Sequence, residues 1–223
     1  MKRILAISFC LSLASALAAH AAVTKPKPAP VSAAAPAAAP AAPAATTATP
    51  AVTDSLGMLE RAFTKDSTNF DNLYHLGVAY LDRDRVADAL RVLQMASRRK
   101  PKDLHTIVNL GAALDASGRA EEAQGQYRHA LEISPGDSVA TCRLASSLYS
   151  QAKYGESIGL LRELIKKKPR SYCAYFTLGV AFADAGIYRD AVRMWKKVVE
   201  IAPSSPEATS AKESIEVLEK FIQ

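Results

Sequence analysis

Residues 104–137 read LHTIVNLGAALDASGRAEEAQGQYRHALEISPGD, and residues 172–205 read YCAYFTLGVAFADAGIYRDAVRMWKKVVEIAPSS. The two stretches align without a gap, and each carries a proline at its thirty-second position. The same spacing of 34 residues separates Pro101, Pro135, Pro169 and Pro203. A fixed period of this length indicates stacked repeats rather than one irregular domain. We therefore divide this part of the chain into four units, 70–103, 104–137, 138–171 and 172–205.

Small and large side chains recur at fixed positions of every unit. Position 8 is small, and is occupied by Gly77, Gly111, Ala145 and Gly179. Position 24 is large, and is occupied by Leu93, Tyr127, Leu161 and Trp195. Side chains three or four residues apart share one face of a helix, so positions 4, 7, 8 and 11 predict a first helix and positions 20, 24 and 27 a second. The small residues at positions 8 and 20 are expected to let the two helices approach closely.

The ends of the units carry helix signals. Proline at position 32 cannot continue a helix interior and closes each unit. The last residue of every unit has a short polar side chain that can cap the helix that follows. These residues are Asp103, Asp137, Ser171 and Ser205. Gly118 and Gly186 stand at position 15, where the chain is expected to turn between the two helices.

This pattern resembles the tetratricopeptide repeat family, whose period and consensus of small and large residues match residues 70–205. The resemblance implies an all-α fold, a right-handed α-solenoid of four helix-turn-helix repeats. Residues 54–69 are predicted to form an N-terminal half-repeat helix. Residues 206–223 are predicted to form a capping helix with one apolar face, because terminal repeats need a polar outer surface. A partner-binding helix is the alternative for this last segment.

The chain begins with a predicted signal peptide, residues 1–21. Lys2 and Arg3 precede an uncharged apolar run over residues 4–18, and small residues follow at the expected cleavage site after Ala21. The run is shorter than the about 20 residues that cross a membrane, which favours cleavage over retention as an anchor. Both outcomes stay open.

Residues 22–53 form an Ala/Pro-rich segment without large apolar side chains other than valine. Such a composition predicts a disordered, extended linker. It acts either as a tether or as a passive leader. A leader of this kind behind a signal peptide is typical of exported proteins of Gram-negative bacteria, so we expect a periplasmic or secreted protein.

No catalytic, cofactor-binding or metal-binding constellation is found in the sequence. The three histidines that follow the predicted signal peptide, His75, His105 and His129, occupy positions 6, 2 and 26 of the repeat, the last two within one unit. Neither an i, i+4 histidine pair nor a glycine-rich phosphate loop accompanies them. Catalysis needs groups that converge on a pocket, and we therefore predict a protein that is not an enzyme and needs no cofactor.

Basic clusters end two of the predicted second helices, over residues 98–102 and 166–170. Cations there complement the helix dipole, and contact with an anionic membrane surface is the less favoured alternative. The net charge of +6 is modest, and neither cluster contains the interleaved aromatic residues typical of nucleic-acid binding. We predict no nucleic-acid partner.

Two cysteines, Cys142 and Cys173, stand at positions 5 and 2 of successive units. The resemblance implies that both lie on neighbouring helices and face the groove. An oxidising compartment permits a disulfide between them. Helix axes lie about 8–10 Å apart, whereas bonded cysteines have Cα atoms about 4.4–6.8 Å apart. Two small apolar groove residues are therefore the alternative.

The resemblance also implies a concave face lined by positions 2, 5, 9, 12 and 13 of the first helices. The candidate partner residues on this face are Tyr74, Leu81, His105, Val108, Asp115, Cys142, Tyr149, Phe176 and Asp184. Apolar and aromatic side chains along a groove suit a peptide segment with hydrophobic anchors. Tyr74, Tyr149 and Phe176 are the expected anchors.

These features together predict a non-enzymatic scaffold of the cell envelope that binds another protein or a peptide segment in its groove. Its role would lie in envelope assembly, secretion or polymer export, as the resemblance implies. The alternative is a tethered structural envelope protein that contacts membrane or wall through its Ala/Pro leader or its basic edges. The sequence does not reveal the oligomeric state.

Overall fold

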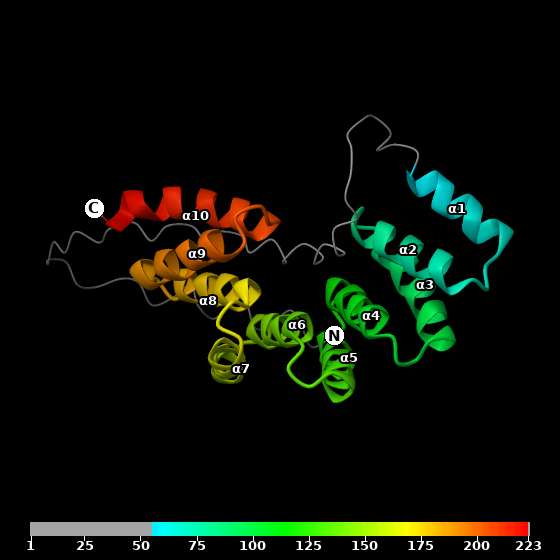
Figure 1. Cartoon of the computed structure of the whole chain (residues 1–223), viewed down its shortest axis with the longest axis horizontal. Coiled ribbons are helices and arrows are strands. Elements are labelled where there is room, and N and C mark those ends of the chain that lie inside the picture. The colour runs from blue at the N-terminus through cyan, green and yellow to red at the C-terminus, as the bar shows by residue number, and fades with distance from the viewer. Residues whose placement is uncertain (1–54, 223) are drawn as a thin grey trace, which may run out of the picture. The chain divides into compact units, whose positions relative to one another are not determined.

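The structure is a computed structural model that describes residues 55–222. The predictions for residues 1–21 and 22–53 lie outside the described residues, as do Asp54 and Gln223. The described chain consists of ten α-helices without a strand, shown in chain order in Figure 1. They are α1 (Ser55–Lys65), α2 (Phe70–Leu81), α3 (Val86–Arg99), α4 (Leu104–Ala116), α5 (Ala120–Ile133), α6 (Ser138–Ser150), α7 (Tyr154–Lys167), α8 (Tyr172–Asp184), α9 (Tyr188–Ile201) and α10 (Pro206–Ile222). The predicted all-α fold is confirmed.

Side-chain caps start three of the helices that follow a proline. Asp103 accepts a hydrogen bond from the backbone N–H of Thr106, and Asp137 accepts one from that of Ala140, both at 2.8 Å. Ser205 caps α10 in the same way. Ser171 is an exception to the prediction, because its side chain makes no cap bond to α8 and lies 3.4 Å from the Cys173 sulfur instead.

The turn inside each helix pair needs a left-handed residue at position 15. Gly118 and Gly186 supply it with φ angles of 78° and 76°. Asp84 and Ala152 adopt the same conformation, with φ of 57° and 61°. The turn therefore has the same backbone geometry in the two repeats that lack glycine at position 15. There, the Cβ atoms of Asp84 and Ala152 make the left-handed conformation sterically less favourable.

The first and second helices differ in their neighbours. Each second helix (α3, α5, α7, α9) packs on the first helix before it and on the helix after it. The first helices (α2, α4, α6, α8) also contact one another in succession, and α8 contacts α10. Among the described residues, successive second helices share no close backbone contacts. The first helices therefore line the inner side of the stack and the second helices its outer side.

Glycine at position 8 makes room for the large side chain at position 24. A Cβ atom added at Gly111 would lie 2.5 Å from the ring of Tyr127, and one added at Gly179 would overlap the indole of Trp195. Gly77 faces Leu93 in the same way. The small residue at position 8 was expected to let the two helices approach closely. The structure shows that the space it leaves is filled by a large side chain of the second helix.

We predict that Gly111→Ala destabilises the protein, although alanine is the better helix former. The buried Tyr127 ring, which is held at its hydroxyl by Asp115, cannot yield to the new methyl group. Overpacking costs about 1–3 kcal/mol, which outweighs the gain of about 0.5–1 kcal/mol in helix propensity.

The matched control is Gly125→Ala, in the middle of α5, where nothing lies within 4 Å of an added Cβ atom. Only the propensity gain applies there, so this variant should be more stable than the wild type by about 0.5–1 kcal/mol. Urea denaturation of both variants checks the pair. Equal stabilisation by both substitutions would contradict the packing argument.

The terminal helices are held by specific polar contacts as well as by apolar ones. On α1, Glu60 accepts hydrogen bonds from Tyr80 at 3.0 Å and from Arg85 at 2.9 Å. On α10, Glu219 pairs with Lys196 of α9 at 2.9 Å. Ala208, Ala211 and Leu218 of α10 are buried in the C-terminal apolar cluster. The apolar face of α10 thus covers α9, as a capping helix requires.

Candidate functional site

The predicted partner residues all stand on the first helices, at the inner side of the stack. Their environments differ. Val108 is buried, Leu81 packs partly buried against the core, and His105 is exposed at the start of α4. These three residues occur on α2 and α4. Leu81 and Val108 thus have a packing role in addition to their groove position.

Tyr74 is half-buried between its own helix and the next first helix. Its ring stacks on Phe70, with ring centroids 6.1 Å apart, and meets His75 edge-on. Asn109 of α4 donates a hydrogen bond to its hydroxyl at 3.3 Å. The ring therefore stands on the groove face while its hydroxyl connects α2 to α4.

Asp115 belongs to a polar cluster between three helices. It accepts hydrogen bonds from Tyr127 of α5 at 2.9 Å and from Ser147 of α6 at 2.8 Å. Burial raises the pKa of the Asp115 carboxyl, while the two hydrogen bonds and the charge of Arg143 oppose the rise. Asp115 is therefore engaged in holding the repeats together, which the sequence pattern alone does not reveal.

Tyr149 links α6 to α8 near the ends of both helices. Its hydroxyl donates to the backbone carbonyl of Ala181 at 3.5 Å, and its ring meets Tyr154 edge-on at 4.8 Å. Burial, followed by the negative charge of nearby Asp184, raises the pKa of Tyr149 to about 12. Tyr149 and Asp184, both predicted site residues, are thus brought together.

Cys142 and Cys173 form a disulfide between α6 and α8, with Cα atoms 6.2 Å apart. The Cys173 sulfur also lies 3.5 Å from the carbonyl oxygen of Ser138. The sequence left two alternatives, a disulfide or two unbonded groove residues, and the structure contains the disulfide. Adjacent first helices approach closely enough at this point for the Cα atoms to fall within the usual range.

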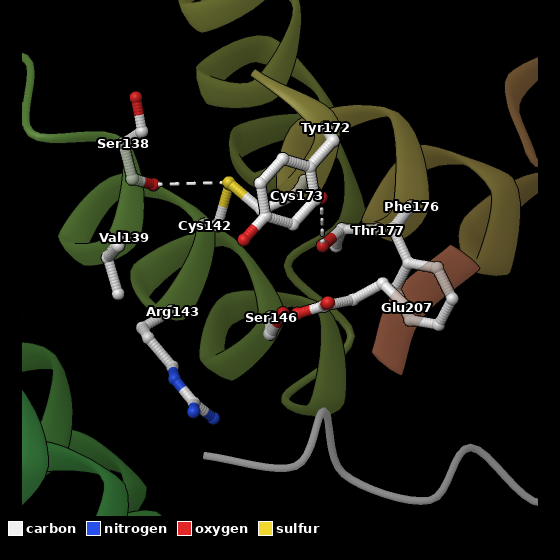
Figure 2. A pocket seen from close by; sticks show the side chains of 10 residues that line it. All are labelled: Ser138, Val139, Cys142, Arg143, Ser146, Tyr172, Cys173, Phe176, Thr177 and Glu207. Carbon is white, nitrogen blue, oxygen red and sulfur yellow. Dashed lines mark hydrogen bonds between the residues drawn. A yellow bond between two sulfur atoms is a disulfide. The ribbon is translucent and has the colours of Figure 1, made fainter. Parts of the chain in front are cut away.

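A pocket of about 100 Å³ opens beside the disulfide, between α6 and α8 (Figure 2). Its walls include groove positions of both helices, namely Val139, Cys142, Ser146, Cys173 and Phe176. Two predicted partner residues, Cys142 and Phe176, therefore lie in one pocket. The other seven lie elsewhere along the face.

The C-terminal helix also contributes to this pocket. Glu207, in the first turn of α10, lines it together with Tyr172 and Thr177 of α8. Glu207 was not among the groove residues predicted from the sequence. The repeat could have identified it, because Glu207 follows Cys173 by one further repeat length of 34 residues.

The two basic clusters lie mainly at the C-terminal ends of the second helices α3 and α7. Arg98 and Arg99 occupy the last turn of α3, and Lys166 and Lys167 the last turn of α7, where they face the negative end of the helix dipole. The neighbouring Lys100 lies 3.8 Å above the ring of Phe70. These contacts agree with a structural role for the clusters.

The described residues 55–222 contain neither a metal-binding cluster nor a membrane-spanning helix. This part of the chain contains no group of three or more histidine, cysteine, aspartate or glutamate side chains placed to hold a metal ion. Within the same residues, none of the helices has the length and apolar character needed to cross a membrane.

Comparison with known proteins identifies the repeats. The model of the tetratricopeptide repeat family matches residues 142–206. MamA, known from a crystal structure, shares 22% sequence identity with this chain and superposes on it with a TM-score of 0.53. The match covers 70% of this chain and 89% of that chain. TTC0263, a thermophilic TPR protein of Thermus thermophilus, is 17% identical with a TM-score of 0.62, covering 72% and 88%.

A chain of the APC/C hetero-tetramer Cut9–Hcn1 is 11% identical with a TM-score of 0.66, over 76% of this chain and 34% of that chain. A search of curated proteins finds no match. The chain therefore matches the tetratricopeptide repeat family over residues 142–206, and its described part has the fold of tetratricopeptide-repeat proteins, as the 34-residue pattern predicts. This fold generally serves as a non-catalytic scaffold whose concave surface binds proteins or peptides.

Proposed function

We propose that this protein is an exported scaffold of the cell envelope that binds a peptide segment of a partner protein along the inner face of its first helices. The observation that carries the proposal is the pocket between α6 and α8, because groove positions of two successive repeats form its walls. Phe176 stands in this pocket, and Tyr74 and Tyr149 present half-buried rings on the same side of the stack. Aromatic anchors in small pockets are the usual centres of binding energy in protein interfaces.

Two features support export. The first 21 residues have the pattern of a secretory signal peptide. The second is the disulfide between Cys142 and Cys173, because disulfides persist in oxidising compartments and are rare in the cytosol. Envelope assembly, secretion or polymer export is the setting that we infer for such a scaffold.

The proposal predicts that Phe176→Ala and Tyr74→Ala weaken capture of partner proteins about tenfold or more, because each removes an anchor side chain. The measurement is a quantitative pull-down from envelope extracts with the purified chain. Phe176→Ala keeps the backbone carbonyl that accepts the hydrogen bond of the Trp195 indole, so α8 and α9 stay joined.

Phe221→Ala is the matched control. Its side chain is about half exposed and stands outside the groove positions. A deletion of residues 22–53 tests the alternative, a structural protein that acts through its leader. If the two groove variants keep their partners and the deletion loses them, the groove is not the binding site and the alternative holds.

A further inference from the structure

One oxygen of the Glu207 carboxylate is buried without a partner. This atom, Oε2, is shielded from solvent and has no hydrogen bond within the described part of the chain. A carboxylate oxygen removed from water without a donor raises the free energy of the folded state. The pocket wall therefore contains a carboxylate whose hydrogen-bonding capacity is not filled within the described part of the chain.

Aromatic rings flank the same carboxylate. Figure 2 shows Glu207 extending from α10 toward α6, with Tyr172 and Phe176 of α8 beside it. Burial raises the pKa of the Tyr172 phenol, and the negative charge of Glu207 raises it further, so the two groups are within electrostatic reach. Ring faces attract cations. A carboxylate and two rings together favour a positively charged guest.

The charge of the groove differs in sign from that of the whole chain. The groove positions of the four units include no lysine or arginine, although the net charge of the chain is +6. They include four aspartates: Asp71, Asp82, Asp115 and Asp184. The pocket lining contains one basic residue, Arg143, whose side chain lies away from Glu207 in Figure 2 and whose charge acts on Asp115.

The pocket accommodates a side chain rather than a small molecule. Its volume is about 100 Å³, whereas sites for small molecules usually measure about 300–1,000 Å³. A single extended side chain with a charged end fits these limits.

We propose that this pocket receives one lysine or arginine side chain of the peptide bound in the groove, with Glu207 as its counter-ion and Tyr172 and Phe176 as its aromatic walls. The inference rests on the proposed function, since it names the chemistry of the partner for the same site. It also gives α10 a second role, because the capping helix supplies the residue that selects the ligand.

Selection from a random 12-residue peptide library displayed on phage tests this inference on the full chain. Three immobilised proteins are compared: the wild type, Glu207→Gln, and Glu213→Gln as the control. Glu213 is an exposed carboxylate on the same helix and does not line the pocket, so both variants change the net charge equally. The glutamine at position 207 keeps the size of the side chain and removes its charge.

The wild type and Glu213→Gln are expected to enrich peptides with lysine or arginine at one fixed position of the selected motif, and Glu207→Gln is expected to lose this preference. A selected peptide should then lose about tenfold in affinity when norleucine replaces that basic residue. The same change should have little effect on binding to Glu207→Gln.

The two ways in which the experiment can fail are distinguishable. If none of the three proteins enriches any peptide, the proposed function is wrong. If peptides are enriched without a basic position, or if Glu207→Gln keeps the preference, the groove binds peptides and the basic-pocket inference is overturned.

Discussion

Replacing Tyr127 with alanine is expected to lower the free energy of unfolding by about 3–5 kcal/mol, the range for large aromatic residues removed from a core. The Tyr127 side chain is fully buried and fills the space above Gly111. Its hydroxyl donates to Asp115, which Ser147 of the next repeat also contacts. The substitution therefore leaves a cavity and weakens the connection between successive repeats.

Chemical denaturation of purified Tyr127→Ala measures this loss. Tyr127→Phe separates the two contributions, because it keeps the ring and removes the hydrogen bond to a carboxylate, which is worth about 1.5–3 kcal/mol. Tyr154→Ala is the control for loss of an exposed tyrosine. Its side chain is 51% exposed and contacts the ring of Tyr149, so we expect a cost below about 1 kcal/mol. Equal losses at the two positions would contradict the packing assigned to Tyr127.

Removing the disulfide is expected to lower the free energy of unfolding by about 3.7 kcal/mol. The bond joins residues that are 31 positions apart, and a loop of this size restricts the unfolded chain by about that amount. Urea denaturation of Cys142→Ala/Cys173→Ala, compared with the oxidised wild type, measures the effect. Dithiothreitol should destabilise the wild type to a similar extent and leave the double variant unchanged.

Counting thiols provides an independent check. In a chain expressed without residues 1–21, which contain the third cysteine Cys10, reduction should expose both remaining thiols. A thiol count that reduction does not change would show that the bond is absent. The stability argument and the support that the disulfide lends to export would then both fail.

Much of the local structure could be predicted from spacing alone. The prolines and the polar residues before each first helix are local signals, and Asp103 and Asp137 cap α4 and α6 as expected. Ser171 did not follow the pattern, because its hydroxyl lies against the disulfide sulfur rather than the helix terminus. The position of the Ser171 hydroxyl thus depends on the disulfide that Cys173 forms with the distant residue Cys142.

The candidate site was less predictable than the fold. Position in the repeat correctly assigns Cys142 and Phe176 to helix faces that share a pocket. Position in the repeat does not distinguish a groove residue that is free to contact a partner from one that already bonds to other repeats. Asp115 is of the second kind, because it accepts a hydrogen bond from Ser147 of the next repeat as well as one from Tyr127. Glu207 was not predicted as a groove residue, because groove positions were assigned only within the four units 70–103 to 172–205, although its spacing continues the groove pattern.

By itself, the sequence determined the all-α architecture and the recurring positions of small and large side chains, because these depend on periodicity along one chain. The choice between a disulfide and two free cysteines, the partners of Asp115 and the unpartnered oxygen of Glu207 were decided only by tertiary structure. The physical reason is that each depends on the approach of helices from different repeats. Differences of about 1 Å at these contacts decide whether two groups bond, and the period of a repeat does not specify distances that finely.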